Sequence, residues 1–213
     1  MASVGLSDGR GEEGEPLGMT PVTRRDVLKS LTIGVAAGSV LGVIPAEAAE
    51  HAHRMVAAEK SAAGKYTAKF FSAHQYKTLE ALCQAILPSD GEVGGAIEAG
   101  APEFIDLLTS ENPDYQLKLG GGIMWLDSVC SDRYSKSFLE SGPAQQKELL
   151  DLIAYRKNAE ADPSLSQGVD FFSFLRNLTA DGFFTSEIGI KYLAYVGNTH
   201  LKEFPGCPPV PEA

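Results

Sequence analysis

The sequence predicts an all-α fold, in which a single compact domain of about six helices follows a signal segment and precedes a proline-rich coil tail. Three observations predict this class. Apolar residues recur at positions i, i+3, i+4 and i+7 in several segments, as on the buried face of a helix. Glycine and proline separate those segments. No segment alternates apolar and polar residues as a half-buried strand does. We therefore expect helices packed on helices around one core.

Residues 1–48 are typical of a bacterial twin-arginine export signal with a disordered extension at its start. The motif consists of Arg24 and Arg25, an apolar run over residues 31–44, and an A-x-A cleavage site at Ala46 and Ala48. The apolar run is shorter than the roughly 20 residues of a transmembrane helix. We therefore expect a cleaved signal, and a periplasmic protein that the twin-arginine translocase carries in its folded state.

Two other interpretations of this segment are open. A buried amphipathic helix with a basic start would need a polar face, which the apolar run lacks. An uncleaved signal would hold the chain at the membrane, and the short run argues against it. After the signal, residues 49–70 are rich in Ala, Lys, Glu and His, without a clear apolar stripe. We expect a linker or a loosely helical arm there.

Residues 71–213 form the predicted helical domain with its extended tail. The expected helices cover residues 72–87, 102–112, 114–139 with an interruption, 143 to about 158, 169–184, and 186 to about 197. Ser72 is a suitable N-cap for the first, and Pro102 fits the first turn of the second. Three consecutive glycines at 120–122 predict a helix break or a close helix crossing.

Composition and motifs argue against chemistry carried by this chain. The 28 acidic and 18 basic residues give a net charge of −10, which is unsuited to binding nucleic acid. We find no nucleophile elbow, dinucleotide fingerprint, haem-attachment motif or metal-ligand spacing. We therefore expect no catalytic residue, no bound cofactor and no metal site. Asp106, Asp127 and Asp181 are expected to be solvated or capping residues.

One metal hypothesis depends on the cleavage site. If cleavage follows Ala48, the new chain begins Ala49-Glu50-His51. A free amine with histidine at the third position is able to chelate Cu²⁺ or Ni²⁺. The alternative is an incidental histidine in a flexible arm, and we favour that alternative.

The three cysteines fall into two groups. Cys83 and Cys130 lie among apolar residues of expected helices and are predicted to be small buried side chains. Cys207 lies in a proline-rich tail that cannot be helical. An oxidising compartment favours disulfides. Cys207 is therefore a candidate for an intermolecular disulfide, and an intrachain bridge to Cys83 or Cys130 is the open alternative.

Aromatic residues are concentrated in the last third of the chain. They are Phe171, Phe172, Phe174, Phe183, Phe184, Tyr192, Tyr195 and Phe204. One helical core cannot easily bury all of them, and exposed aromatic side chains mark interfaces. We therefore expect a surface for a protein partner in this region, although burial of the whole set in the core is the alternative.

Several motifs, in order and spacing, resemble the gluconate 2-dehydrogenase subunit 3 family, the small subunits of bacterial FAD-dependent sugar and polyol dehydrogenases. They are Ala-Ile-Leu-Pro at 85–88, Phe-Ile-Asp-Leu-Leu at 104–108, Trp-Leu-Asp at 125–127, and the stretches 179–189, 193–198 and 204–207. The resemblance covers about residues 70–208. It implies a helical, non-catalytic subunit that binds no cofactor itself.

The resemblance also implies the partners. The large subunit is a flavoprotein of the glucose-methanol-choline type that holds FAD and performs the oxidation. It is exported together with the small subunit, and its electrons pass to a cytochrome c subunit or another acceptor. The implied contact residues are Phe183, Phe184, Thr185, Ser186, Gly189, Tyr195, Gly197 and Asn198, and Cys207 matches a position that bonds to the large subunit. The alternative function is a stand-alone periplasmic helical binding protein or small enzyme.

Overall fold

The computed structural model describes residues 44–91 and 93–197, and within these ranges the regular structure is helical throughout. This confirms the all-α prediction. The α-helices are α2 (Ala46–Ala63), α3 (Ala73–Ile86), α4 (Ala101–Glu111), α5 (Pro113–Tyr115), α6 (Gly121–Tyr134), α7 (Pro143–Ile153), α8 (Arg156–Ala161), α9 (Ser166–Phe184) and α10 (Glu187–Tyr192). A π-helical turn, η1 (Gln116–Gly120), precedes α6, and a 3-10 turn, η2 (Pro163–Leu165), precedes α9.

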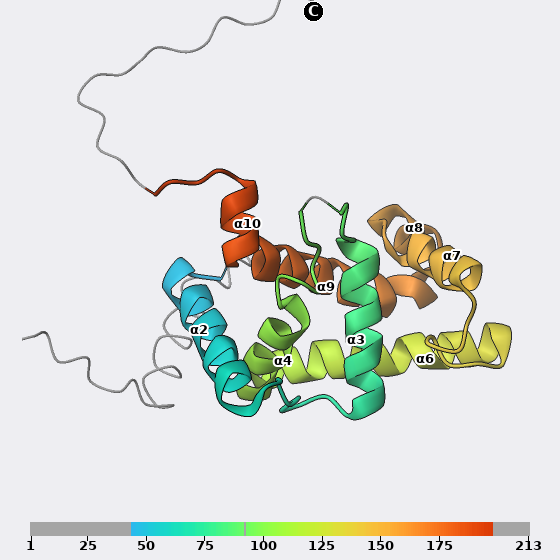
Figure 1. Ribbon diagram of the computed structural model, residues 1–213. Helices are drawn as coiled ribbons and strands as arrows, with labels where there is room; N and C mark the ends of the chain where they lie inside the picture. Colours follow the sequence, from blue (N-terminus) through green and yellow to red (C-terminus); the bar gives the residue numbers. More distant parts are fainter. Residues whose placement is uncertain (1–43, 92, 198–213) are drawn as a thin grey trace, which may run out of the picture.

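Helix α9 is the central element of the domain. It packs against α3, α4, α6, α7, α8 and α10. Figure 1 shows α9 and α6 running across the domain, with α2 and α4 at one side and α7 and α8 at the other. Helix α4 lies between α2 and α9 and contacts both. The two termini of α9 therefore meet different neighbours, and its C-terminal end leads directly into α10.

The start of α3 follows from a local sequence signal. The Gln75 backbone N–H donates to the Ser72 hydroxyl (3.3 Å), and the Ser72 N–H donates to the Gln75 side-chain oxygen (3.1 Å). This reciprocal capping box satisfies two backbone donors that the first turn leaves without partners. Pro102 lies in the first turn of α4, as the sequence predicts.

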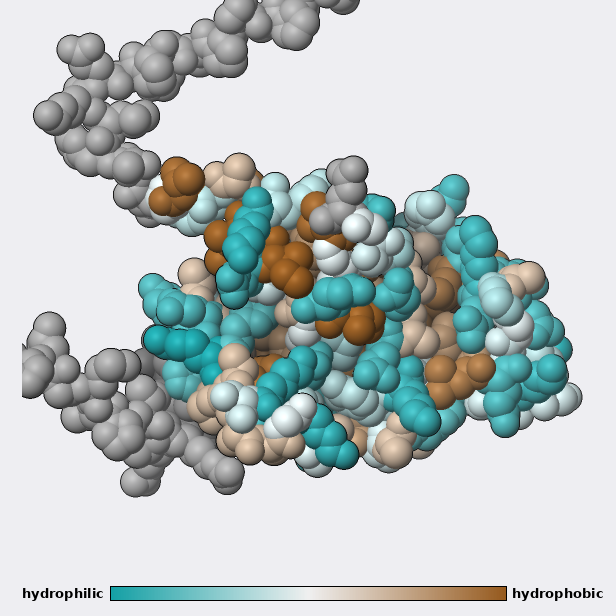
Figure 2. Space-filling model, in the orientation of Figure 1, coloured by the Kyte–Doolittle hydropathy of each residue, from teal (hydrophilic) through white to brown (hydrophobic). Residues whose placement is uncertain are grey.

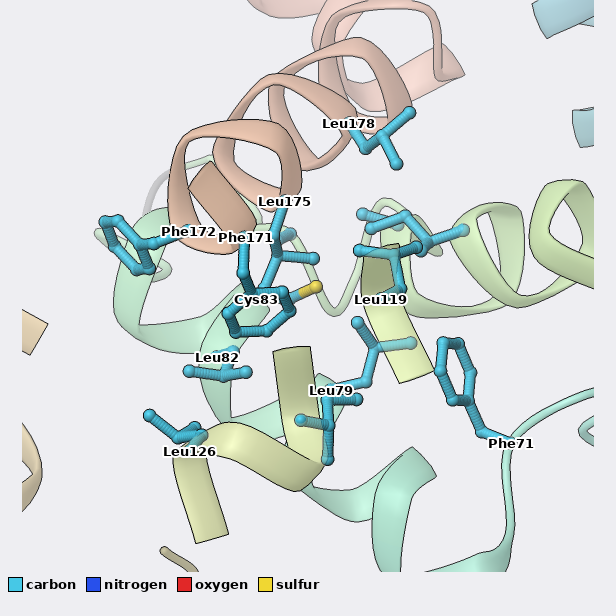
Figure 3. Packing of buried hydrophobic residues seen from close by; sticks show 14 of the residues in the cluster. Phe71, Leu79, Leu82, Cys83, Leu119, Leu126, Phe171, Phe172, Leu175 and Leu178 are labelled. Atoms are coloured by element: carbon cyan, nitrogen blue, oxygen red, sulfur yellow. The ribbon is translucent and has the colours of Figure 1, made fainter. Parts of the chain in front are cut away.

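The core is built from apolar side chains of α2, α3, α4, α6, α7 and α9 together with η1. Figure 3 shows Cys83 of α3 close to Leu175 of α9, with Leu79, Leu82 and Leu119 beside them. The fully buried members include Leu79, Leu82, Cys83, Phe104, Ile105, Leu119, Leu126, Leu149 and Leu175. The i, i+3, i+4 spacing of residues 79, 82 and 83 places them on one face of α3.

The glycine triplet marks a close helix crossing. A Cβ atom built on Gly122 of α6 would lie 2.0 Å from the ring of Phe171 of α9. Conversely, a Cβ on Gly168 of α9 would lie 2.2 Å from the ring of Trp125 of α6. Each helix therefore has a glycine at the position where an aromatic ring of the other helix packs against it. Of the two predicted explanations for the triplet, the structure supports the close crossing.

Asp106 corrects an expectation. We expected a solvated or capping carboxylate, whereas the side chain is fully buried in α4. It accepts hydrogen bonds from the Tyr66 hydroxyl (2.8 Å) and from the backbone N–H groups of Lys69 (2.6 Å), Phe70 (3.2 Å) and Phe71 (3.1 Å). These four donors come from the connection between α2 and α3. The carboxylate thereby fixes that connection on α4, because a buried charge is stable only when it is fully hydrogen-bonded.

The other two aspartates are less buried. Asp127 accepts a hydrogen bond from the Phe138 N–H (3.0 Å) and contacts the His74 ring at 2.7 Å. It joins α6 to the segment before α7 and to α3. Burial raises the pKa of Asp181, which lies in α9. The prediction of a solvated or capping role therefore fits Asp127, which accepts a backbone N–H at the start of a turn, and is wrong for Asp106.

Residues 46–63 differ from the expected linker or loosely helical arm. They form helix α2, which packs on α4. Its buried residues are Ala48, Ala49, Ala52 and Val56. This face consists mostly of alanine, so it carries little apolar contrast in the sequence, yet its small side chains let α2 approach α4 closely. The ordered domain therefore begins well before residue 71.

Candidate partner interface

The junction between α9 and α10 is tightly hydrogen-bonded. Ser186 is the N-cap of α10 and accepts a hydrogen bond from the Gly189 N–H (3.1 Å), while its hydroxyl donates to the Phe183 carbonyl (2.6 Å). A Cβ atom on Gly189 would lie 2.1 Å from that same carbonyl oxygen. Only glycine therefore lets α10 begin so close to the end of α9.

Beyond this junction the chain exposes large apolar side chains. We call this surface the C-terminal apolar face, and it consists of Phe184, Ile190, Tyr192, Leu193, Tyr195 and Val196. Tyr195 is 55% exposed and Val196 is 86% exposed. Figure 2 shows hydrophobic side chains gathered over α10 and the segment that follows it. Large apolar side chains gathered in this way are typical of a binding site for another protein.

The eight residues predicted for the partner interface are divided by the structure. Phe183, Ser186 and Gly189 are buried and shape the junction, and Thr185 is half-buried. Phe184, Tyr195 and Gly197 are exposed, and Gly197 has a left-handed backbone with φ 87°. Asn198 lies outside the described residues, as do Arg24, Arg25 and Cys207. Ala46 and Ala48 of the predicted cleavage site lie in the first turn of α2.

Three apolar residues of the C-terminal apolar face were not predicted to be exposed. Ile190, Leu193 and Val196 are exposed, although the first two have the spacing of a buried stripe. Helical spacing alone does not reveal whether an apolar stripe meets the core or the solvent. The tyrosines gave the better signal, because Tyr192 and Tyr195 belong to the aromatic set from which we predicted an interface.

Helix α2 is joined to this junction through His53. The ring stacks on Phe104 of α4 with 4.8 Å between centroids, and its Nε2 lies 2.9 Å from the Thr185 hydroxyl. That hydroxyl also donates to the carbonyl of Asp181 (2.5 Å). Because a threonine hydroxyl has one hydrogen, the His53 Nε2–H is the donor in the contact with Thr185.

Burial lowers the pKa of His53 below its ordinary value. A charged imidazolium loses hydration when it is enclosed between α2, α4 and the α9–α10 junction. The neutral ring, with hydrogen on Nε2, is therefore the form that fits this contact. His53 acts as a polar connection between α2 and the base of the C-terminal apolar face.

A cavity of about 490 Å³ lies beside this connection, between α2, the 98–100 turn and α10. Its charged lining residues are Glu50, Arg54, Lys60, Glu98 and Glu187. Four of them are already paired, since Arg54 contacts Glu50 at 3.5 Å, Lys60 contacts Glu103 of α4, and Glu187 contacts Lys191 at 2.8 Å. Charges of both signs with partners of their own do not define a site for a small ligand, so we regard the cavity as part of the surface around α10.

The described residues gather no candidate metal centre, since they contain no group of three or more His, Cys, Asp or Glu that could hold an ion. The copper hypothesis for His51 also meets a geometric obstacle. His51 lies inside α2, and its Nδ1 is buried without a hydrogen-bond partner. Chelation by a chain terminus would require this helix to unwind. Among the same residues, no helix combines the length and hydrophobicity that crossing a bilayer requires.

Cys83 and Cys130 are buried, as the sequence predicts, and both are free. The thiol of Cys83 lies 3.6 Å from the Thr179 hydroxyl, and burial raises the pKa of this thiol to about 12. A thiol reacts through its thiolate, which is scarce at such a pKa. Both side chains are therefore structural, and neither is poised to form a disulfide while the core is closed.

A helical domain that exposes a group of large apolar side chains has a feature typical of subunits that bind another protein. A comparison with protein-family models identifies the family of subunits to which the chain belongs. The chain matches Gluconate 2-dehydrogenase subunit 3 over residues 73–206 and belongs to this family. It is therefore an accessory subunit of a multi-subunit dehydrogenase. Comparisons with curated proteins and with solved structures give no match.

Proposed function

We propose that this chain is the non-catalytic small subunit of a periplasmic, FAD-dependent dehydrogenase that oxidises a sugar, a polyol or a glycoside. In this proposal it binds the catalytic flavoprotein, of the glucose-methanol-choline type, through the C-terminal apolar face. The observation that supports it best is the exposure of Tyr192, Tyr195 and Val196 within the segment that matches the family. FAD belongs to the large subunit, and a cytochrome c subunit or another acceptor takes the electrons.

The proposed role has a thermodynamic basis. A subunit that binds only the folded, FAD-loaded flavoprotein stabilises that state by mass action. The twin-arginine signal of this chain then carries both proteins, because that route accepts folded cargo. Fold and surface are consistent with such a role, since α10 presents its apolar side chains on a junction that is rigidly hydrogen-bonded to α9 and α2.

Export of the pair is tested by replacing Arg24→Lys and Arg25→Lys together. We expect both this chain and the flavoprotein to remain in the cytoplasm, and dehydrogenase activity to disappear from the periplasmic fraction. Arg10→Lys, which lies before the signal motif, is the matched control and is expected to leave export unchanged. Periplasmic flavoprotein in the double variant would refute joint export.

Binding is tested by purification of the complex. We expect this chain to co-purify with a large, yellow flavoprotein whose spectrum shows bound FAD. A monomeric, colourless chain that binds no flavoprotein from the same cells would support the alternative function, a stand-alone periplasmic binding protein or small enzyme.

The tail cysteine is tested on non-reducing gels. Cys83 and Cys130 are buried, so an intrachain bridge to either of them would require the core to open. We therefore favour a bond between Cys207 and the flavoprotein. The wild-type complex is expected to migrate as one cross-linked band that Cys207→Ser abolishes. Two separate bands from the wild-type complex would contradict this part of the proposal.

A further inference from the structure

The predicted cleavage bond, between Ala48 and Ala49, lies in the first turn of α2. The Ala48 and Ala49 N–H groups both donate to the Pro45 carbonyl at 3.0 Å, so the helix begins upstream of the bond. Ala49 has no exposed surface, and Ala48 is 5% exposed. A protease binds its substrate in an extended conformation in its own cleft. The bond is neither extended nor accessible in this structure.

Contacts along the whole of α2 hold this turn in place. Ala49, Ala52 and Val56 belong to the buried core, and Ile44, just before the helix, packs against it. His53 contacts Thr185 across the domain. Further along, Glu59 pairs with Lys69 at 2.8 Å, and Lys60 pairs with Glu103 of α4. Exposure of the first turn therefore requires α2 to separate from α4.

Cleavage would also leave an unfavourable product. It would create an ammonium group on Ala49, a position without solvent exposure, at the helix end where the backbone dipole is positive. It would remove Pro45, whose carbonyl accepts the first hydrogen bonds, and Glu47, the acidic residue of the first turn. The core would lose the packing of Ile44 as well.

We propose that docking of α2 on α4 protects the Ala48–Ala49 bond, so that the folded, exported subunit keeps this bond intact. The bond is cut only in molecules whose α2 is undocked. Residues 44–48 are then part of the working subunit, as the cap and first turn of a structural helix. This inference rests on the proposed twin-arginine export, because that route delivers the domain already folded to the periplasmic side, where signal peptides are removed.

The test is the N-terminus of the exported chain. Full-length protein is produced with its flavoprotein, and the periplasmic and membrane fractions are separated. The chain from each fraction is analysed by intact mass and N-terminal sequencing. Wild type is compared with Ala52→Asp, which places a carboxylate in the interface of α2 with α4, and with Ala58→Asp, which makes the same change on the exposed side of α2.

We expect wild type and Ala58→Asp to retain the Ala48–Ala49 bond, and Ala52→Asp to yield chains that begin at Ala49. Wild-type chains that begin at Ala49 would overturn the inference, whatever the variants do. An intact bond in exported Ala52→Asp would overturn the claim that α2 docking provides the protection. Export is read separately, by fractionation. A wild-type chain found only in the cytoplasm would refute the proposed export and not the protection of the bond.

Discussion

At the start of α9, the rings of Phe171 and Phe172 are buried against α6 and the rest of the core, whereas beyond its end Tyr192 and Tyr195 are more than half exposed. Both regions are rich in aromatic residues, and the two regions are fewer than 25 residues apart in the sequence. In the first region, Gly122 of α6 lies opposite the ring of Phe171, so that α6 and α9 pack closely around this ring. In the second region, Tyr192 touches the ring of Phe183 along one edge, and more than half of its surface is in solvent.

The difference separates what folds the domain from what is available to a partner. Aromatic rings at the crossing of α6 and α9 contribute burial and packing, and their loss should unfold the domain. Rings on the C-terminal apolar face contribute less to the isolated fold, since a large part of their surface is still in water. These rings would become buried only when another molecule binds. Substitutions in the first region should therefore change the free energy of unfolding, and substitutions in the second should change the affinity for a partner.

The largest effect is expected on the buried side, at Asp106. Asp106→Ala removes the acceptor of four hydrogen-bond donors in the connection between α2 and α3. We expect a loss of about 4 kcal/mol in the free energy of unfolding, since buried donors without partners are costly. Urea unfolding measures it. Asp132→Ala, which removes an exposed carboxylate from α6, is the control and should change stability by less than about 0.5 kcal/mol. Equal stability of the two variants would show that Asp106 does not fix the connection.

A second buried-side prediction compares neighbouring glycines. Gly122→Ala places a Cβ atom 2.0 Å from the ring of Phe171, and we expect it to cost about 3 kcal/mol because the two helices must separate. Gly121→Ala meets its nearest atom at 4.0 Å and should stabilise α6 by up to about 1 kcal/mol, because alanine favours helix over glycine. Thermal unfolding of both variants measures the difference. A tolerated Gly122→Ala would contradict the close crossing.

On the exposed side, Tyr195→Ser combined with Val196→Ser should leave the fold intact and weaken binding. We expect a stability change within about 0.5 kcal/mol and at least a tenfold, or about 1.4 kcal/mol, loss of affinity for the flavoprotein. Titration calorimetry with the purified large subunit measures the affinity. Tyr155→Ser removes a tyrosine that is similarly exposed but lies just before α8, outside the apolar face, and should bind normally. Equal binding by both variants would place the interface elsewhere.

The smallest expected effect concerns His53, which joins α2 to the base of the apolar face. Burial lowers the pKa of His53 in the folded state, so the unfolded chain binds a proton first as pH falls below about 6.5. Stability therefore decreases with falling pH in that range. In His53→Gln this contribution is absent, and the loss of stability between pH 7.5 and 5.5 should be smaller. Urea unfolding at both values gives the comparison, and identical losses would show that His53 is not buried as described.

The parts of the fold that the sequence predicts are those with local signals. Ser72 and Pro102 mark helix starts, and the glycine triplet marks a crossing, because caps and turns depend on neighbouring residues. Helix α2 was not predicted as a packed helix, because its buried face is mostly alanine, which differs little in hydrophobicity from the rest of the segment. The burial of Asp106 depends on donors 35 to 40 residues away, and no local pattern reports such a contact.

The candidate site was predicted as a region more than as a set of residues. The aromatic content predicts an interface within residues 171–204, and the motif resemblance implies contact residues between 183 and 198. The division into a buried junction and an exposed face depends on the structure. Gly189 and Ser186 serve the junction. Ile190 and Leu193 are exposed because α10 projects from the end of α9, and that direction depends on the packing of the whole domain.

Binding of the flavoprotein to the C-terminal apolar face is best tested by amide hydrogen exchange. Exchange is measured on the isolated subunit and on its complex with the large subunit. We predict that complex formation slows exchange in residues 184–197 and leaves the amides of α7 and α8 unchanged. Protection confined to α7 and α8, with exchange in residues 184–197 unaltered, would contradict the assignment of this face.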